Sequence, residues 1–585
     1  MLFKKIFFII AFIILGCLSM VYSASADTFT VTKTADTNDG ICDSDCSLRE
    51  AVAAANQNNS DDETIDIILP TGEFNISTFG VFNLSPIYGE DDPEMEINII
   101  GSGINETIID AANLSGIFNF IYQDYNSFTI RLSDLTVKNG FSAINGGAIN
   151  ILNADALYLD NVNFENNHAA ANGGAIYTTG VYEYLIKNSN FINNSAINGG
   201  VIYFSLNEQL NMLGGAIINS KFDSNQANGG NGGAVYFEKF SDHMYGETND
   251  FINTLIINNQ AVAGAAIFTD NAALNISFNT FYNNSAEQGN ALYNNDAEIN
   301  LYSNIITSAS EQSNCGNNTA KIYSAGYNIE NKNDCNLINA TDIINTDPLL
   351  DSTAQLTINS PGINRVGYAD CWDYYSLHRH TLANGGDGSY SHYFIRYDRQ
   401  NRLRIHNCDI GSEEFWPEPG LAVASVNGEK NKVQVSYNNQ TTATYRIFHT
   451  TVQKNSLVAM YDTNVGIALS PTGKKISVFN LYDGAVYDRD LISNNVRTER
   501  RLEIFNTKYE RYIFIIQKNN RNVLMTIVSL DTDFMQMEKI STKILTDQNV
   551  SLKKSSLTNN IFTLKNKKGK TIAKYRLNYQ ISKIK

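Results

Sequence analysis

The residues best suited to metal binding or catalysis are four histidines late in the chain. Imidazole is a frequent metal ligand and a general acid or base near neutral pH, and all four fall within 30 residues. Their spacing fits no established metal-binding motif, so we expect no metal and no other cofactor. The group comprises His378, His380, His392 and His406, with Arg379 and Asp398 nearby.

Two other places carry reactive side chains. The acidic run at residues 90–94 could bind calcium, but no Lys or Arg accompanies it in sequence to act as a base. A solvated loop is the simpler interpretation, and Asp242-His243 has no evident partner. The sequence contains no Gly-x-Ser-x-Gly, His-Glu-x-x-His or phosphate-binding motif. A catalytic site is therefore not evident, although one assembled from distant segments stays open.

The N-terminus has the three parts of a secretory signal peptide. Lys4 and Lys5 precede an apolar run, and Ala24-Ser25-Ala26 offers small residues for a signal peptidase. We expect cleavage after Ala26, with lipidation of Cys17 as the open alternative. No other stretch approaches 18 consecutive apolar residues, so we expect no transmembrane segment after signal removal. The protein is then secreted or on the cell surface, with a periplasmic or lipoprotein location still open.

Six cysteines follow the signal peptide, and they lie in pairs close in sequence. An exported protein meets an oxidising compartment, so disulfides are the expected state. A zinc site is the weaker alternative, because the paired spacings of zinc ribbons are missing. From proximity alone we expect the pairs Cys42 with Cys46, Cys315 with Cys335, and Cys371 with Cys408.

A recurring block dominates the middle of the chain. Each copy begins with an aromatic or Ile residue that has an Asn three positions later. Gly-Gly-Ala-Ile-Tyr or a variant of it follows a few residues further along the chain. The spacings between successive anchors are 27, 31, 34 and 25 residues, and a variable period with a fixed core is typical of a β-solenoid. We therefore expect an all-β fold, a right-handed parallel β-helix with inward anchors, Gly turns and Asn ladders. The anchors are Phe164, Phe191, Phe222, Ile256 and Phe281.

A cap is expected in front of the first coil. The segment 28–32 alternates polar and apolar residues as a strand does, and Ser47 and Glu50 have the spacing of a helix capping box. A short helix should follow to Asn56, with the Cys42–Cys46 disulfide holding the loop before it. Such an N-terminal capping helix would protect the open end of the solenoid from edge-to-edge pairing.

Three sets of residues resemble known families over roughly residues 28–415. The run Cys46-Ser47-Leu48-Arg49-Glu50-Ala51 resembles the CSLREA motif of secreted bacterial β-helix proteins, and the repeats resemble those of chlamydial polymorphic outer-membrane proteins, which are adhesins. Residues 347–350, 360–363 and 408–411 resemble the closing coils of CSLREA-type proteins. The resemblance implies a surface protein acting in adhesion or binding to glycans or cell-surface partners. A carbohydrate-active enzyme of the pectin lyase-like fold is the alternative, so enzymatic activity stays uncertain.

Charge divides the chain into an acidic and a basic part. The whole chain carries −17, but residues 421–585 carry +14 and residues 1–420 carry −31. We expect a signal peptide at 1–26, a cap at 27–63, the β-helix at 64–415, a linker at 416–420 and a smaller all-β domain at 421–585, propeller-like or a sandwich. We expect no nucleic-acid partner; the basic domain suggests an anionic surface or glycan as partner. Its expected contacts are Lys553, Lys554, Lys565, Lys567, Lys568 and Lys570.

Overall fold

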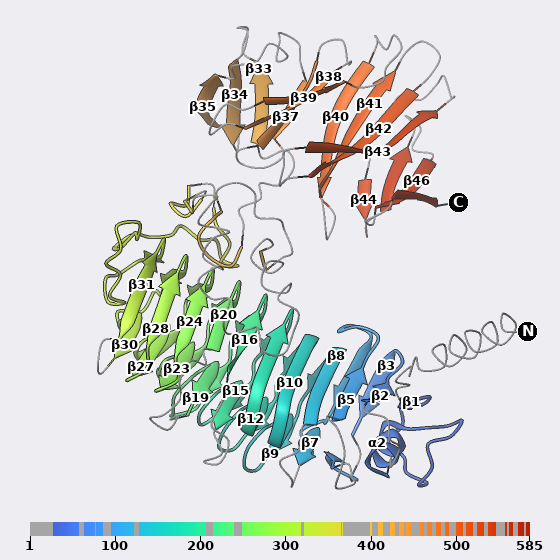
Figure 1. The fold of residues 1–585 in the computed structure, drawn as a ribbon, viewed down its shortest axis with the longest axis vertical. Coiled ribbons are helices and arrows are strands. Elements are labelled where there is room, and N and C mark those ends of the chain that lie inside the picture. Colours follow the sequence, from blue (N-terminus) through green and yellow to red (C-terminus); the bar gives the residue numbers. More distant parts are fainter. Residues whose placement is uncertain are drawn as a thin grey trace, which may run out of the picture.

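The computed structural model describes most of the chain from residue 27 onward. The described residues are 27–57, 64–76, 78–85, 95–121, 128–205, 214–238, 249–317, 321–357, 359–363, 365–366, 398–399 and 408–413, together with strands between 422 and 584. Nearly all of them are strands, bends or turns, and one helix is present (Figure 1).

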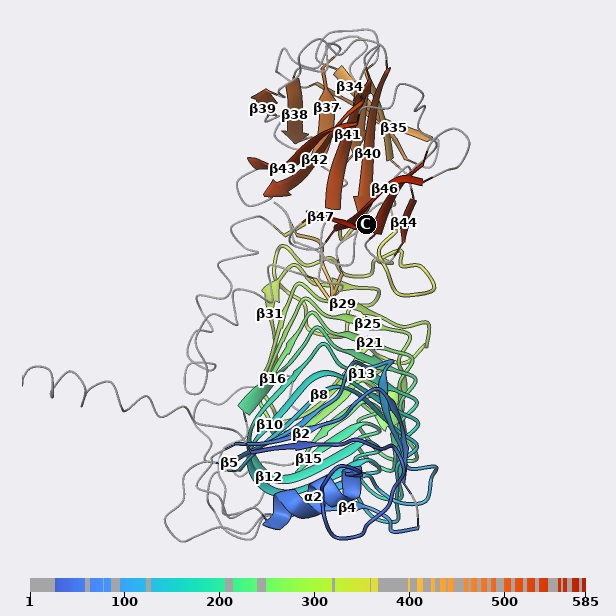
Figure 2. The same cartoon turned by 90° about the vertical axis from the view of Figure 1, so that its right-hand side faces the viewer.

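Parallel strands stack coil upon coil, which makes this part of the protein a right-handed parallel β-helix, as expected (Figure 2). Each coil contributes a strand to each of three faces, and the long strands β8 (Phe128–Lys138), β10 (Ile149–Glu165) and β12 (Ile176–Lys187) run through corners between faces. The pairing is continuous enough to count as one sheet of 26 strands.

The first face is the part of each coil that follows the Gly-Gly turn. Its strands are β4 (Phe82–Leu84), β7 (Phe118–Ile121), the starts of β10 and β12, β15 (Ile202–Ser205), β19 (Val235–Phe237), β23 (Ile267–Asp270), β27 (Leu292–Asn295) and β30 (Cys315–Asn317).

The second face comes next along each coil. Its strands are β1 (Asp27–Thr30), β2 (Thr64–Ile68), β5 (Met95–Ile100), the start of β8, parts of β10 and β12, β16 (Gly214–Ile218), β20 (Asn249–Ile252), β24 (Leu274–Ser277), β28 (Ile299–Tyr302) and β31 (Ile322–Gly326).

The third face and a narrow edge ladder complete each coil. The third face contains β3 (Gly72–Asn75), β6 (Thr107–Asp110), the ends of β8 and β10, β13 (Asn190–Ile192), β17 (Lys221–Asp223), β21 (Leu255–Ile257), β25 (Thr280–Tyr282), β29 (Ile305–Thr307) and β32 (Ile329–Glu330). The edge ladder contains β9 (Phe141–Ser142), β11 (His168–Ala169), β14 (Ser195–Ala196), β18 (Gln226–Ala227), β22 (Gln260–Ala263) and β26 (Ser285–Gln288).

The aromatic anchors of the repeat point into the core, as expected. Phe164 stacks on Phe191 with ring centroids 5.2 Å apart, and Phe191 stacks on Phe222 at 4.6 Å. These three rings, and Ile256 and Phe281 in the next coils, are fully buried. Because equivalent residues pair in register, one column of side chains becomes a continuous apolar core.

The Asn residues of the repeat form the expected ladder at a buried turn. The Nδ2 of each Asn donates to the Oδ1 of the Asn one coil further on, over distances of 2.9 to 3.1 Å. The same Oδ1 accepts the backbone N–H of the preceding Asn, so the ladder also satisfies buried turn amides. The ladder runs through Asn167, Asn194, Asn225, Asn259 and Asn284.

The two glycines of each Gly-Gly pair have different roles. The first adopts a left-handed conformation, with φ +66° at Gly173 and +60° at Gly199, which glycine adopts without a steric penalty. The second allows close approach of two coils. A Cβ on Gly174 would lie 2.1 Å from the carbonyl oxygen of Gly200, which is a severe overlap.

The N-terminal cap uses almost every residue of the Cys46–Ala51 run. Helix α2 (Leu48–Gln57) begins with the expected capping box, because the Ser47 N–H donates to Glu50 Oε2 at 2.7 Å and the Glu50 N–H donates to Ser47 Oγ at 3.2 Å. Arg49 makes two hydrogen bonds to Asp36 and lies over the Phe82 ring of the first face. The helix lies at the N-terminal end of the stack, beside β1, β2 and β4 (Figure 1).

The segments expected as closing coils are placed differently. Ile343 adds one parallel bridge to Ile329, but the described bridges beyond it, Leu350–Leu356 and Val366–Cys408, are antiparallel. Residues around them pack against the outer side of the second and third faces, in a cluster that includes Ile218, Ile252, Phe278, Leu356 and Ile410. We call residues 343–366 and 408–413, where described, the lateral segment. The last coils are therefore covered from the side.

The corner between the second and third faces has an unusual backbone conformation. One residue per coil there is left-handed, with φ between +50° and +57°. Where the corner is not covered this residue is Asp134, Asn161 or Asn188, types that tolerate the conformation. At the lateral segment it is Ser303, whose carbonyl accepts the Gly411 N–H, or Phe278, which is fully buried despite a φ of +57° that is costly for an aromatic residue. Burial of its ring offsets that strain.

The C-terminal strands form four separate antiparallel sheets. Each sheet is built from strands that are consecutive in the chain, an arrangement that propeller blades share. The sheets contain β33 (Ala422–Val426), β34 (Lys432–Tyr437) and β35 (Gln440–Arg446); β36 (Leu457–Met460), β37 (Val465–Leu469), β38 (Lys475–Asn480) and β39 (Val486–Asp490); β40 (Glu499–Asn506), β41 (Arg511–Lys518), β42 (Val523–Asp531) and β43 (Gln536–Leu545); and β44 (Ser556–Thr558), β45 (Ile561–Lys565), β46 (Thr571–Leu577) and β47 (Ile581–Ile584).

Candidate functional site

A column of aromatic side chains lies on the outer side of the first face. In each repeat the Ile, Val or Leu after the Gly turn points inward, so the next residue points outward. The strands β12, β15, β19, β23 and β27 pair in register at this outward position (Figure 1). The column, which we call the aromatic column, consists of Tyr177, Tyr203, Tyr236, Phe268 and Tyr293.

The rings of the aromatic column stack on one another. Successive centroids are 5.7, 4.6, 4.7 and 5.2 Å apart, with interplanar angles of 21°, 6°, 11° and 3°. Such offset stacking is a favourable arrangement for aromatic pairs. Ring faces cover each other along the rod, and the Tyr203 and Phe268 side chains are buried, so solvent or a ligand can reach ring edges only at the other three coils. Tyr177, Tyr236 and Tyr293 are partly exposed.

The aromatic column has defined ends. The same outward position is occupied by Asn83, Asn119 and Asn150 in the preceding coils. In the coil after Tyr293 it is occupied by Gly316, and a Cβ there would lie 2.8 Å from Cδ2 of the Tyr293 ring. The aromatic column is thus limited to five coils.

A polar column runs beside the aromatic one, two residues further along each strand. Ser205 Oγ donates to the Glu238 carboxylate, and Asn295 Nδ2 donates to Asp270 Oδ1 at 2.8 Å. With Thr179 these residues present hydroxyl, carboxylate and amide groups at successive coils. The two columns hold two carboxylates and, among their described residues, no Lys, Arg or His.

Burial raises the pKa of two phenols of the aromatic column, Tyr203 and Tyr236. Burial, with the Asp270 and Glu238 carboxylates nearby, raises the pKa of Tyr236 to about 12. Burial and Glu238 also raise the pKa of Tyr203 well above its usual value. At neutral pH the column therefore offers hydroxyl donors beside carboxylate acceptors, which suits a ligand rich in hydroxyl groups.

Sequence reasoning did not single out this surface. The tyrosines appear in the repeat as part of Gly-Gly-Ala-Ile-Tyr, but roles were predicted only for its apolar anchors, glycines and asparagines. The signal was present nonetheless: strand alternation places an aromatic residue directly after an inward Ile on the outer side. Periodicity alone could not show that the five rings would be adjacent and unbroken.

The cysteines form disulfides where the structure describes them. Cys42 is bonded to Cys46 and Cys315 to Cys335, two of the three expected pairs. Cys408 is also disulfide-bonded, while its expected partner Cys371 lies outside the described residues.

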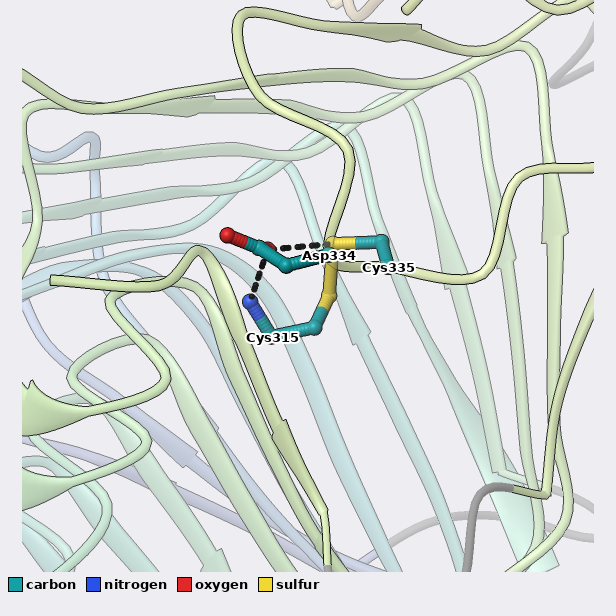
Figure 3. A group of neighbouring side chains, drawn as sticks. All are labelled: Cys315, Asp334 and Cys335. Carbon is teal, nitrogen blue, oxygen red and sulfur yellow. Dashed lines mark hydrogen bonds between the residues drawn. A yellow bond between two sulfur atoms is a disulfide. The ribbon is translucent and has the colours of Figure 1, made fainter.

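The Cys315–Cys335 disulfide lies beside a carboxylate (Figure 3). Its two sulfurs and an oxygen of Asp334 lie within 4.8 Å of one another, a distance that would suit a metal ion. The sulfurs are bonded to each other and cannot serve as thiolate ligands. Asp334 Oδ1 accepts the N–H groups of Asn314 and Cys315 at 2.9 and 3.0 Å, so the carboxylate orders a turn.

Glu330 is fully buried next to this turn. Burial, reinforced by Asp334, raises the pKa of Glu330 to about 7. Its carboxyl accepts hydrogen bonds from Asn314 Nδ2 at 3.1 Å and from the Cys335 N–H at 3.3 Å. Asn314 links Glu330 to Ser308, whose Oγ accepts a hydrogen bond from Lys332 Nζ at 3.5 Å, so a cation lies two side chains away in the same network.

Most other candidates from sequence lie outside the described residues. This applies to the four histidines, to the acidic run 90–94 and to Asp242-His243, whereas Asp398 is described and buried. Of the six lysines, Lys565 ends β45, where it pairs with Thr571. The other five lie outside the described residues, namely Lys553, Lys554, Lys567, Lys568 and Lys570. Within the described part of the chain, no helix is long and apolar enough to span a membrane.

Comparison with known proteins gives one local similarity. Residues 161–179 match the Chlamydia polymorphic membrane protein repeat. The matched segment begins at the left-handed corner residue Asn161, includes the anchor Phe164 and the Gly173-Gly174 turn, and ends just after Tyr177 of the aromatic column. No curated protein matches the chain. Part of one coil is thus similar to the Chlamydia polymorphic membrane protein repeat, while the CSLREA resemblance stays a prediction.

Proposed function

We propose that the protein is an exported, surface-exposed binding protein that acts in adhesion through the outer side of the first face. The observation that carries this proposal is the aromatic column: five stacked rings in register, with phenol hydroxyls beside a polar column. Tyr is frequent at binding hot spots because it combines a large rigid ring with a hydroxyl. The match to a polymorphic membrane protein repeat supports a surface role.

The proposal is tested by removing the phenol hydroxyls while keeping the stack. Phe268 already occupies the column, so Phe fits there. We expect the full-length protein with Tyr177, Tyr203, Tyr236 and Tyr293 all changed to Phe to lose at least about tenfold in binding to cell surfaces and glycan arrays, since each hydrogen bond contributes about 1 kcal/mol. Tyr323→Phe is the control, because Tyr323 is half exposed on the second face. Equal binding by both variants would refute the proposed surface.

Attachment of the rod is a second part of the proposed function. The basic part after residue 420 carries +14, whereas residues 27–420 carry −33. We propose that the basic part holds the protein to an anionic surface, from which the acidic rod projects. Docking of the basic part on its own acidic rod is the competing arrangement. Binding by the full chain to anionic vesicles at low salt, lost at high salt, supports attachment.

A glycoside hydrolase remains the alternative function, and one observation favours it. Glu238 and Asp270 are outward neighbours on adjacent coils, one residue beyond the paired Phe237 and Thr269. Parallel strands lie about 4.8 Å apart, close to the separation of roughly 5 Å between the two carboxyl groups of retaining glycosidases. Release of reducing ends from polysaccharides, abolished by Glu238→Gln and by Asp270→Asn, would establish it. Absence of release by the wild-type protein leaves binding as the function.

A further inference from the structure

A second surface, separate from the aromatic column, runs along the corner between the third and first faces. We call it the uncharged edge. It contains no Asp, Glu, Lys or Arg, and His168 is its only titratable side chain. The rod around it is strongly acidic, since residues 27–420 carry −33. Two rods can therefore approach each other along this edge without placing like charges in contact. The uncharged edge consists of residues 78–81, 111–116, 139–147, 166–173, 193–199, 224–232 and 258–264.

The uncharged edge also exposes large apolar side chains. Ile144 is 68% exposed, Leu114 61% and Ile197 45%, and both Phe79 and Phe141 are exposed as well. These five are almost half of the eleven large apolar side chains that are exposed in the described part of the chain. Single exposed apolar residues are common on protein surfaces, whereas a contiguous group marks an interaction site.

Backbone hydrogen bonds fix the order of these residues along the edge. The Ala171 N–H donates to the Ile144 carbonyl, and the Ile197 N–H donates to the Ala171 carbonyl. In the next coil Gly230 packs directly against the Ile197 carbonyl. A Cβ on the adjacent Gly229 would meet no atom within 4 Å, so the space beside it is open. Side chains are thus large before Ala171 and missing two coils after it.

This order of sizes suits a second copy of the same chain that runs antiparallel. With a two-fold axis at Ala171, Ile144 meets Ile197 of the second copy, and Leu114 meets the open space at Gly229 of the second copy. A parallel pair would instead place Leu114 against Leu114 and glycine against glycine. Bulky groups would then collide where the glycines leave a gap, and protein contacts disfavour both.

We infer that the uncharged edge is a self-association surface, through which two copies of this protein form an antiparallel dimer with its two-fold axis at Ala171. The inference does not use the first face and goes beyond the proposed function. A two-fold axis perpendicular to both rods keeps the two first faces on the same side of the dimer. The dimer therefore presents two copies of the aromatic column to one opposing surface, which raises the strength of adhesion through avidity.

The first test is sedimentation of the full-length protein at low salt and at about 1 M salt. A dimer held by apolar contacts persists at high salt, whereas association through the basic part after residue 420 is screened there. Ile144→Asp puts a charge into the interface twice, once from each copy, and should weaken the dimer at least about a hundredfold. Leu152→Asp is the matched control, because Leu152 is exposed in the same coil but on the first face. Circular dichroism checks that both variants are folded.

The second test uses disulfide cross-linking to measure the direction of pairing. Full-length Ile144→Cys mixed with full-length Ile197→Cys should form a linked dimer under mild oxidation. Neither variant alone should do so, because in the antiparallel dimer its two copies of the cysteine lie about 10 Å apart, too far for a disulfide.

Four results would overturn the inference. They are a monomer at every concentration tested, a dimer that dissociates at high salt, a dimer that Ile144→Asp leaves unchanged, and linkage of Ile144→Cys to itself, which would mean a parallel pair. None of these results affects the four-Phe variant of the aromatic column, so the proposed function stands or fails separately.

Discussion

The close approach of two coils at Gly174 allows the stacking of coils to be tested by a single substitution. A Cβ at this residue would lie 2.1 Å from the Gly200 carbonyl oxygen and 2.6 Å from the Ser195 N. The Ser195 carbonyl carbon lies 2.7 Å away, and all three neighbours are backbone atoms, so no flexible side chain can move aside. The coils would have to separate by about 1 Å, which weakens the hydrogen bond from the Gly174 N–H to the Gly199 carbonyl, now 3.0 Å.

We expect Gly174→Ala to destabilise the protein by at least about 3 kcal/mol, from overpacking together with weakened coil-to-coil hydrogen bonds. Gly174→Val should be worse, because it adds two methyl groups at the same place. The measurement is the urea midpoint of unfolding, followed by far-ultraviolet circular dichroism.

Gly116→Ala is the matched control. Its φ is not left-handed, and the nearest atoms to an added Cβ are 3.8 Å away, an ordinary contact distance. It should shift the midpoint little. If Gly174→Val unfolds at the same urea concentration as wild type and Gly116→Ala, the coil contact described here is misplaced and the reasoning fails.

Four further predictions concern other parts of the molecule. Cys46→Ala should lower both solubility and the melting temperature, because it frees the loop before α2; unchanged values would mean that the cap has no protective role. Burial raises the pKa of Glu330 from 4.5 to about 7. The contribution of the protonated carboxyl to the free energy of unfolding is therefore fully present below pH 4.5 and is lost as the pH rises through about 7. Glu330→Gln should remove this pH dependence, worth about 3 kcal/mol, and unfolding curves at pH 5 and pH 8 check it. N-terminal sequencing of the exported protein should begin at Asp27, whereas a lipid on Cys17 would contradict that cleavage. Changing the six lysines to Gln should abolish low-salt retention of the full chain on heparin, and unaltered retention would exclude them as contacts: Lys553, Lys554, Lys565, Lys567, Lys568 and Lys570.

The sequence predicted those parts of the fold that depend on the repeat. Phe191, Gly173 and Asn194 recur because each coil must solve the same packing and turn problem, so their roles follow from residue type and spacing. The capping box of Ser47 and Glu50 was predictable because it is a local interaction.

The remainder depends on contacts between distant segments. Phe278 looks like another apolar strand residue, and nothing near it in sequence shows that Ile410 covers it. The aromatic column was not predicted because its residues lie within the repeat, and a repeated residue is usually structural. Only the register of five coils shows that the rings form one surface.

The lateral segment divides the rod into coils that can be added or deleted without loss of other contacts and coils that cannot. Among the described residues, those before Leu185 take no part in the cluster at the lateral segment, so gain or loss of a whole repeat there would lengthen or shorten the rod without disturbing that cluster. The coils from Leu185 to Ile329 share this cluster, and in two of them the Ser412 N–H donates to Thr280 Oγ1 and the Gly411 N–H donates to the Ser303 carbonyl. A repeat inserted there would shift Thr280 relative to Ser303 and break both bonds. We therefore expect homologues with longer or shorter rods to differ in the number of their N-terminal coils and to keep the covered coils unchanged in number.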